Sequence, residues 1–331
     1  MAYTDIDDPS AYFQTALFTG NAGTNAITNT GNSDLQPDWV WFKCRSAAEH
    51  HGLFDSVRGV TKAVYSNLNI AEDNLADSLA SFNSDGFTMG ADTGSGGAFN
   101  GNTKTMVAWQ WKETATAGFD IVSYSGNNST NRQISHSLSA KPDMMLVKCR
   151  QAGLWKIYHS SLGATKYLVL SDTAGVVDNN STWNDTEPTS SNFTLGDDGN
   201  VNETGETYIN YLFAEKQGYS KFGSYVGNGN ADGTFVYTGF KPSFVMVKST
   251  GGESNWQMSD NKRNTFNEVN KHLRANSSGA EFTNYPIDFL SNGFKLRATD
   301  TDTNGSGTTY IYAAFAENPF TTSTGVPATA R

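Results

Sequence analysis

The feature that most constrains the fold is one strand-like stretch that the chain contains three times. It spans residues 37–43, 142–148 and 242–248, and each copy opens with a proline, continues with a short apolar run and ends with a lysine. A short apolar run bounded by a turn residue is typical of a strand buried on both faces. A buried helical segment has the same pattern, but the short length and the β-branched and aromatic content favour a strand. We predict that this strand is central in each of three similar β units.

The segments around this strand repeat as well. Each copy begins with a strand-like segment that leads into Gly-Asn and finishes with an aromatic-rich segment. The period of roughly 100 residues exceeds the ~20–50 residues of solenoid and propeller repeats and has the size of a domain. We predict an all-β chain of three tandem antiparallel β-sandwich domains, lectin-like or jelly-roll-like, with Gly/Asn turns between short strands. The predicted boundaries are an N-terminal arm (1–11), repeat 1 (12–114), repeat 2 (118–217), repeat 3 (219–318) and a C-terminal tail (319–331).

The charge balance narrows the classes of partner. The 331-residue chain has a formal net charge of −10, and its Lys and Arg residues are not clustered. Such a chain repels phosphate, so we expect no nucleic-acid partner. No apolar run approaches the ~20 residues that span a bilayer, so we expect no membrane insertion. The polar, acidic N-terminus does not resemble a secretory signal, which predicts synthesis in a cytoplasm.

The cysteines and histidines suggest neither a disulfide nor a cofactor. Cys44 and Cys149 follow the closing lysine in two copies of the repeated strand, and Ser249 holds this position in the third. A disulfide would require two equivalent strand ends of different repeats to meet within ~6 Å, so we expect free thiols. The five histidines share no equivalent position and form no zinc pattern with the cysteines. We predict no cofactor.

The chain resembles a group of phage proteins over nearly its whole length. The strings that carry this resemblance are residues 7–15, 35–41, 55–60, 213–223 and 288–296. They are similar to tail-fibre-like virion structural proteins of marine tailed phages, which are built from tandem lectin-like repeats of unknown function. The resemblance implies a place on the phage particle surface, other virion proteins as partners and a homo-oligomer, commonly a trimer. It implies no specific binding residue.

Three tryptophans are candidates for stacking on sugar rings, because an aromatic face buries the apolar face of a sugar. Trp183 lies in a polar segment and is the best exposed candidate. Trp155 and Trp256 begin the segments 155–159 and 256–260, which alternate large and polar residues as half-exposed strands do. The alternative for all three is an ordinary place in the core.

One glutamate recurs two residues after the last aromatic of each closing segment. A glycosidase would use such a glutamate with a second carboxylate about 5–10 Å away. Because the same residue occurs in every repeat, a structural pair with the lysine of the repeated strand is the simpler interpretation. The predicted pairs are Lys43 with Glu113, Lys148 with Glu215 and Lys248 with Glu317.

One acidic loop resembles the start of a calcium-binding loop. It contains Asp300, Asp302 and Asn304, but Ile311 stands where such a loop needs its bidentate glutamate. Asp and Asn also favour ordinary turns, so a solvated loop is the simpler interpretation. Calcium remains a weak alternative.

These observations predict a non-enzymatic virion protein. The first hypothesis is a tail-fibre or receptor-binding component that contacts a host glycan through variable loops on a rigid scaffold. The second is a capsid decoration or adaptor protein that binds other virion proteins. A glycan-degrading enzyme is a third, weaker hypothesis. No Gly-x-Ser-x-Gly, P-loop or His-Glu-x-x-His motif occurs in the chain.

Overall fold

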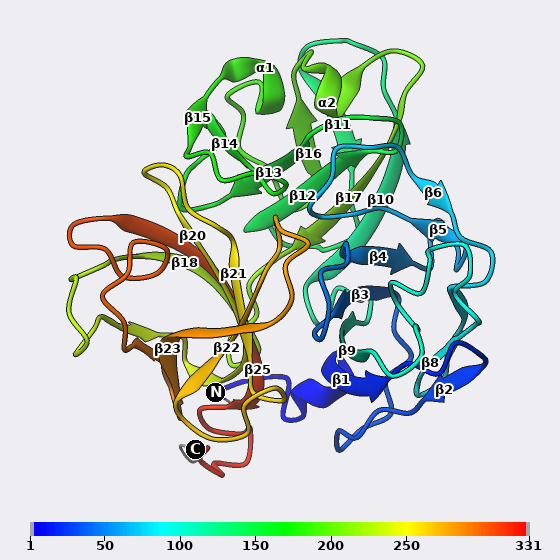
Figure 1. Cartoon of the computed structure of the whole chain (residues 1–331). Coiled ribbons are helices and arrows are strands. Elements are labelled where there is room, and N and C mark those ends of the chain that lie inside the picture. The colour runs from blue at the N-terminus through cyan, green and yellow to red at the C-terminus, as the bar shows by residue number, and fades with distance from the viewer. Residues whose placement is uncertain (1–2, 329–331) are drawn as a thin grey trace.

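The computed structural model describes residues 3–328 and confirms the predicted all-β fold. The three repeats lie around a common centre, with repeat 1 at the right, repeat 2 at the top and repeat 3 at the left of Figure 1. Segments near the two ends of the described chain contact each other, since the backbone N–H of Ser323 donates to the Asp7 carboxylate at 2.6 Å. The described helices are short: η1 (Pro9–Ala11), α1 (Asn180–Trp183) and α2 (Gly199–Asn202).

Repeat 1 contains a four-stranded antiparallel sheet in the order β1-β9-β3-β4. A second sheet has the order β2-β8-β7, and β5 pairs with β6. The strands are β1 (Phe13–Thr19), β2 (Asn25–Ile27), β3 (Trp39–Cys44), β4 (Gly52–Asp55), β5 (Lys62–Ala63), β6 (Asp73–Asn74), β7 (Leu79–Asn83), β8 (Gly86–Met89) and β9 (Thr105–Trp111).

Repeat 2 has the same central arrangement, in the order β10-β17-β12-β13, and extends it with β14 and β15. Its second sheet pairs β11 with β16. The strands are β10 (Phe119–Ser125), β11 (Arg132–Ser135), β12 (Met144–Cys149), β13 (Trp155–His159), β14 (Lys166–Val169), β15 (Val177–Asp178), β16 (Asn192–Leu195) and β17 (Thr207–Phe213).

Repeat 3 joins both layers into one eight-stranded sheet, in the order β18-β25-β20-β21-β22-β23-β24-β19. Its first four strands match the central order of the other repeats. The strands are β18 (Ser220–Val226), β19 (Phe235–Tyr237), β20 (Phe240–Ser249), β21 (Gln257–Asp260), β22 (Val269–Arg274), β23 (Phe282–Leu290), β24 (Gly293–Leu296) and β25 (Thr309–Pro319).

The repeated strand lies inside its sheet in every repeat, as predicted. Strands β3, β12 and β20 each pair with a strand on both sides, and all their residues are buried. One face of each strand packs into the repeat's own core, while the other faces a core shared by all three repeats. In the shared core, Trp39, Met144 and Phe244 occupy equivalent positions. Burial on both faces explains why the strand has no polar break.

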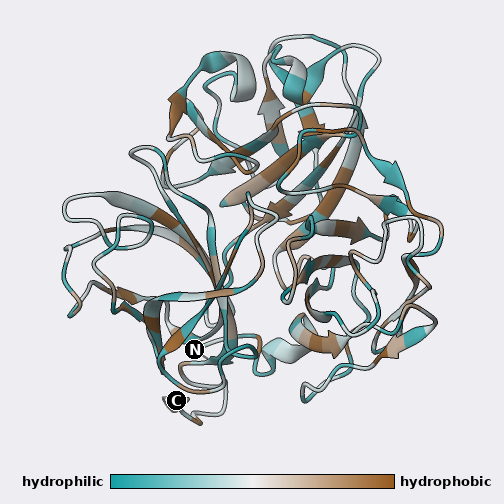
Figure 2. Ribbon diagram, viewed as in Figure 1, coloured by the Kyte–Doolittle hydropathy of each residue, from teal (hydrophilic) through white to brown (hydrophobic). Residues whose placement is uncertain are grey.

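The shared core holds the repeats together. It is the largest hydrophobic cluster among the described residues and draws on strands of all three repeats. Figure 2 shows apolar colour along the strands that converge between the repeats. Each Å² of apolar surface removed from water stabilises the folded state by roughly 25 cal/mol, so burial of this cluster holds the three repeats together. Each repeat also keeps a separate core of its own.

Polar contacts link the repeats in a closed ring. The indole Nε1 of Trp155 donates to the carbonyl of Tyr65 in repeat 1, at 2.8 Å. The indole of Trp256 donates to Val169 in repeat 2, at 2.9 Å. The equivalent His51 contacts the carbonyl of Arg274 in repeat 3, also at 2.9 Å. Each repeat therefore contacts the preceding one through an equivalent residue, and repeat 1 contacts repeat 3.

The prediction of half-exposed strands at residues 155–159 and 256–260 is wrong. Every residue of β13 and β21 is buried. Successive side chains of these strands point into two different cores, rather than alternately into a core and into water. Ile157 faces the shared core, whereas Tyr158 faces the core of repeat 2.

Candidate functional site

The ring has three seams, where the first strand of one repeat meets the preceding repeat. At the seam between repeats 1 and 2, Glu113 Oε1 accepts a hydrogen bond from the backbone N–H of Ile121, at 3.1 Å. The side chain of Ile121 is only 5% exposed and belongs to the shared core. Burial, together with the hydrogen bond to the Asp120 carboxyl, raises the pKa of Glu113 to about 7. This seam is filled.

The seam between repeats 2 and 3 is filled in a related way. Lys221 forms an ion pair with Glu215, the counterpart of Glu113, at 2.6 Å. Phe222 is 5% exposed and packs its ring 5.9 Å from that of Phe213. A charged pair and an apolar side chain therefore close this seam as well.

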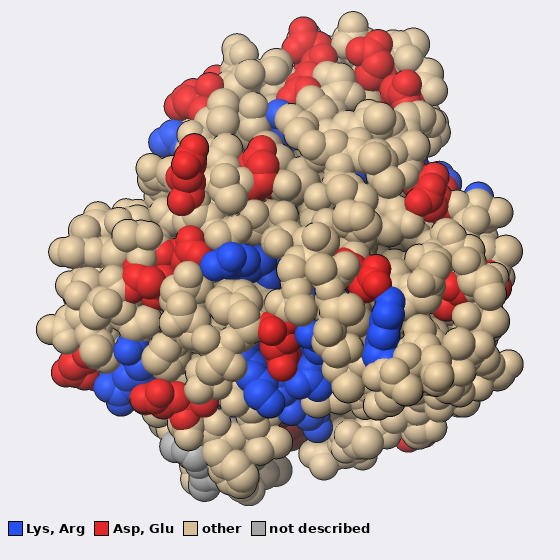
Figure 3. Space-filling view, in the orientation of Figure 1, with Lys and Arg blue, Asp and Glu red and all other residues tan. Residues whose placement is uncertain are grey.

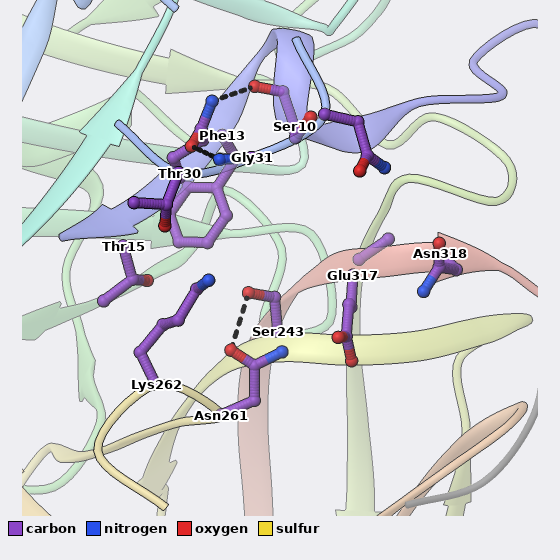
Figure 4. A pocket seen from close by; sticks show the side chains of 13 residues that line it. Ser10, Phe13, Thr15, Thr30, Gly31, Ser243, Asn261, Lys262, Glu317 and Asn318 are labelled. Carbon is purple, nitrogen blue, oxygen red and sulfur yellow. Dashed lines mark hydrogen bonds between the residues drawn. The ribbon is translucent and has the colours of Figure 1, made fainter. Parts of the chain in front are cut away.

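The seam between repeats 3 and 1 is open. A cleft of about 320 Å³ lies there, and we call it the seam cleft (Figure 4). A second hollow of about 170 Å³ adjoins it and shares Thr15, Thr30 and Lys262. The described residues that line the seam cleft are Ser10, Phe13, Gln14, Thr15, Thr30, Gly31, Asn32, Ser243, Asn261, Lys262, Ala316, Glu317 and Asn318.

One difference on the repeat 1 side accounts for part of the opening. By strand register, Thr15 is the counterpart of Ile121 and Phe222: each lies opposite the equivalent residue of the last strand. Threonine is smaller than either apolar residue. The space that an isoleucine or phenylalanine fills at the other seams is therefore left empty here.

A second difference lies on the repeat 3 side. Asp38 and Asp143 each accept a hydrogen bond from the backbone N–H of the equivalent glutamate, at 2.8 Å. Repeat 3 has Ser243 at this position, and the pairing of β20 with β25 is irregular beside it. Glu317 turns to Lys241, at 3.3 Å. Serine has no carboxylate to accept from the backbone N–H of Glu317 as Asp38 and Asp143 do at the other seams.

Lys262 extends into this space from a rigid turn. Asp260 accepts hydrogen bonds from the backbone N–H groups of Lys262 and Arg263, at 3.0 and 2.8 Å. It also pairs with the Arg263 side chain at 2.6 Å, and both side chains are fully buried. In Figure 4 the end of Lys262 lies between Thr15 and Ser243, below the ring of Phe13. Among the described residues, no hydrogen bond or ion pair engages its ammonium group.

The Thr15 hydroxyl is the second unpartnered group of the cleft. Thr15 is 4% exposed, and its Oγ1 atom has no hydrogen-bond partner among the described residues. Leaving a buried hydroxyl unpaired costs about 1–3 kcal/mol. In Figure 4 this hydroxyl points toward Lys262. A ligand that hydrogen-bonds to both groups would recover this cost.

The remaining walls suit a polar ligand. Ser243 donates to the Asn261 amide oxygen at 3.4 Å, and this bond does not use the N–H₂ group of the Asn261 amide. Glu317 is the one carboxylate among the described lining residues. Figure 3 shows most charged side chains dispersed over the face drawn, with basic side chains gathered around an acidic one at its lower centre. Among the described residues that line the cleft, Lys262 is the one cation.

The three tryptophans proposed for sugar stacking are buried, so that prediction is wrong. Trp155 and Trp256 are 0% and 1% exposed and link neighbouring repeats. Trp183, also 1% exposed, lies in α1 and donates to the carbonyl of Lys166 at 3.1 Å. Its polar sequence neighbours cap α1 and form turns, while the indole packs inward.

The predicted lysine–glutamate pairs are also wrong. The ammonium groups of the three lysines are buried and donate to the carbonyl of the last residue of their own strand. Those carbonyls belong to Cys44, Cys149 and Ser249, at 2.7, 2.8 and 3.0 Å. Burial lowers the pKa of Lys43, Lys148 and Lys248 to about 8 in each case. The glutamates lie at the opposite end of the sheet and contact the seams instead.

The acidic loop of repeat 3 uses its oxygens within the protein. Asp300 accepts from the N–H and hydroxyl of Thr303, at 2.9 and 2.8 Å. Asp302 accepts from Gln257 at 2.7 Å. Asn304 is fully buried and donates to the Ala298 carbonyl at 2.8 Å. Between residues 3 and 328, no three His, Cys, Asp or Glu residues are grouped as a metal site requires.

Sequence reasoning missed Lys262 and Thr15 as site residues. The repeat pattern held a usable signal, since Thr15 aligns with isoleucine and phenylalanine in the other copies. Likewise, by strand register, Lys262 holds the position of Val57 and Ser161 in the turns of the other repeats. Both cysteines are free, as predicted, and the structure shows that they are also buried.

The fold and site define an all-β protein of three repeats with a polar cleft at one seam. The chain belongs to the family described as "Domain of unknown function (DUF7483)", whose model matches residues 8–319. Comparison with curated proteins finds no match. Comparison with solved structures finds none either. Within the described residues, no helix is long and apolar enough to cross a membrane.

Proposed function

We propose that this protein is a surface component of a tailed-phage particle that binds a host glycan in the seam cleft without cleaving it. The observation that carries the proposal is the cleft itself, with an unpaired lysine and an unpartnered buried hydroxyl on a rigid frame. Its volume lies at the lower end of the roughly 300–1,000 Å³ of ligand pockets. A virion location rests on the resemblance of the sequence to tail-fibre-like proteins.

Two further features support binding by this cleft. Lys262 lies in the stretch that diverges between repeats, where a variable specificity residue is expected on a constant scaffold. The lining includes one carboxylate, Glu317, among the described residues, whereas most glycosidases use a pair. These features favour recognition over hydrolysis.

A microarray of bacterial surface polysaccharides tests this function. The labelled full-length chain should bind a subset of spots, and Thr15→Ile combined with Lys262→Val should remove that binding. This double variant copies the residue types of the filled seam between repeats 1 and 2. Lys112→Met, at another exposed lysine, should bind as the wild type does. Absence of wild-type binding to every glycan and to host cells would refute the proposal.

A second candidate function is docking to another virion protein, as a decoration or adaptor component. Repeat 3 exposes Val226, Phe235 and Tyr237 by 54%, 44% and 54%. The positions equivalent to the two aromatics in repeats 1 and 2 hold Ala26, Thr28, Gln133 and Ser135. An apolar group found on one repeat only is typical of a contact surface.

A cryo-EM map of the phage particle that carries this chain separates the two candidates. Density at the tail or fibre, with the seam cleft facing solvent, supports host recognition. Density flat on the capsid shell, with Phe235 and Tyr237 against a neighbour, supports decoration and contradicts the glycan-binding role.

A further inference from the structure

We infer that the seam cleft accepts a sugar residue that carries one anionic group, either a carboxylate or a sulfate. The inference rests on the proposed glycan-binding function and adds the ligand class. It follows from the charges, the hydrogen-bonding groups and the size of the cleft, argued in turn below.

The charge argument concerns Lys262. The second charged lining residue, Glu317, is paired with Lys241, so that pair contributes little net charge. Asp260, beneath Lys262, is buried and paired with Arg263. The Lys262 ammonium group is therefore the one uncompensated charge that faces the cleft among the described lining residues. On a chain of net charge −10, this local positive charge favours an anion that also fits the cleft closely.

The hydrogen-bonding argument concerns the hydroxyl groups of a sugar. The Thr15 hydroxyl can donate to the anionic group beside Lys262 or accept from a ring hydroxyl. Asn261 and Asn318 supply amide groups, and the Glu317 carboxylate can accept from sugar hydroxyls. A sugar ring offers several hydroxyls in different directions, which matches donors and acceptors spread over several walls.

The size argument sets the ligand at about one sugar residue. The cleft measures about 320 Å³, and its floor includes Phe13 and Ala316. Phe13 is 3% exposed, because it packs against Trp111, Phe244 and Phe315. It therefore gives a rigid apolar base rather than a free stacking face. The adjoining hollow, which shares Lys262 and Thr15, offers room for the next residue of a chain.

The turn that carries Lys262 has a natural comparison within the molecule. The turn from Asp55 to Arg58 repeats the same buried ion pair at 2.6 Å and contacts Tyr211 across its own seam, at 2.7 Å. It places Val57 where repeat 3 places Lys262, and Val57 is 46% exposed. The same scaffold thus presents an apolar residue at a filled seam and a cation at the open one.

Titration by saturation-transfer NMR and calorimetry tests the ligand class. The probes are glucuronic acid, galacturonic acid, N-acetylneuraminic acid and glucose 6-sulfate, with glucose, galactose and an Asp-rich peptide as comparisons. At least one anionic sugar should bind at least tenfold more tightly than the neutral sugars, and its affinity should fall as salt rises. The carboxylate and sulfate probes distinguish the two anionic groups.

The variants locate the binding. Lys262→Met should weaken binding of the anionic sugar at least tenfold, and Thr15→Val should weaken it about threefold or more. Lys112→Met should bind as the wild type does, and Val57→Lys should create no second site. Lys262 is exposed, so its substitution should leave the fold intact, as circular dichroism will verify.

The outcomes separate this inference from the proposed function. Equal affinity for neutral sugars, or no effect of Lys262→Met while array binding persists, would overturn the inference and leave glycan binding standing. Preference for the Asp-rich peptide would overturn the sugar class altogether. Failure of every sugar, together with an empty glycan array, would overturn both.

Discussion

The seam between repeats 1 and 2 and the seam between repeats 3 and 1 are built from equivalent elements but differ in packing. The chain runs continuously across the first, where Ile121 fills the space and Glu113 reaches the following strand. The second closes the ring without a covalent link, and there Thr15 leaves a cleft. The difference teaches that internal repetition can supply a rigid ring while one seam remains available for a ligand.

The largest expected effect tests whether the buried Asp–Arg pair stabilises the turn equally at both seams. Asp260→Ala should lower the free energy of unfolding by about 3–5 kcal/mol, because it leaves the buried Arg263 without its partner. Asp55→Ala at the filled seam should cost a similar amount, for the same reason. Urea denaturation measures both, with the exposed Asp34→Ala as a control that changes stability by less than about 0.5 kcal/mol. A large loss of stability at one seam only would show that the two turns contribute differently to the free energy of unfolding.

An exchange of residues between the seams tests the packing difference directly. Ile121→Thr should destabilise the protein by about 2–3 kcal/mol, because it removes apolar volume and buries a hydroxyl. Thr15→Ile should stabilise it by about 0.5–1 kcal/mol, because it fills the cleft and removes the unpartnered hydroxyl. Thermal unfolding of both variants provides the measurement. If Thr15→Ile destabilises the chain, the open seam does not have room for the isoleucine that occupies the equivalent position at the filled seam.

The smallest expected effect is a pH dependence at the filled seam. The pKa of Glu113 lies near 7 in the folded protein, above the ordinary value of 4.5, so the folded state binds more protons between these values. Stability from this group should therefore be full below pH 4.5 and fall as pH rises to about 7. Because Glu113 is only half-buried, we expect a change of about 1 kcal/mol.

Glu113→Gln isolates this contribution. The variant should gain stability relative to the wild type at pH 8, and the difference should shrink or reverse at pH 4. Unfolding curves at several pH values record it. An unchanged difference across this range would exclude Glu113 as the titrating group.

Much of the fold was predictable because its signals are local. The repeated strand is marked by a proline, an apolar run and a lysine within a few residues, and β3, β12 and β20 follow this pattern. Gly-Asn pairs likewise mark turns by their backbone preferences. These signals need no knowledge of distant partners.

The candidate site was not predictable by the same means. Trp155 and Trp256 were expected on half-exposed strands because alternation usually separates core from water. In this protein a neighbouring repeat covers the second face, and a local pattern cannot report that. Lys262 and Thr15 lie far apart in the chain, and each is unremarkable in its own segment. Only ring closure brings them to one cleft.

The sequence by itself therefore determined the all-β class, the threefold repetition, the central strand and the free thiols, since all depend on short-range patterns and their spacing. The tertiary structure decided that the repeats share a core, that the tryptophans are buried and that one seam stays open. Those outcomes depend on how strands distant in the chain pack. At the closing seam, Thr15 takes the place of Ile121, Lys262 the place of Val57 and Ser243 the place of Asp38, and a polar cleft lies where the other seam is packed.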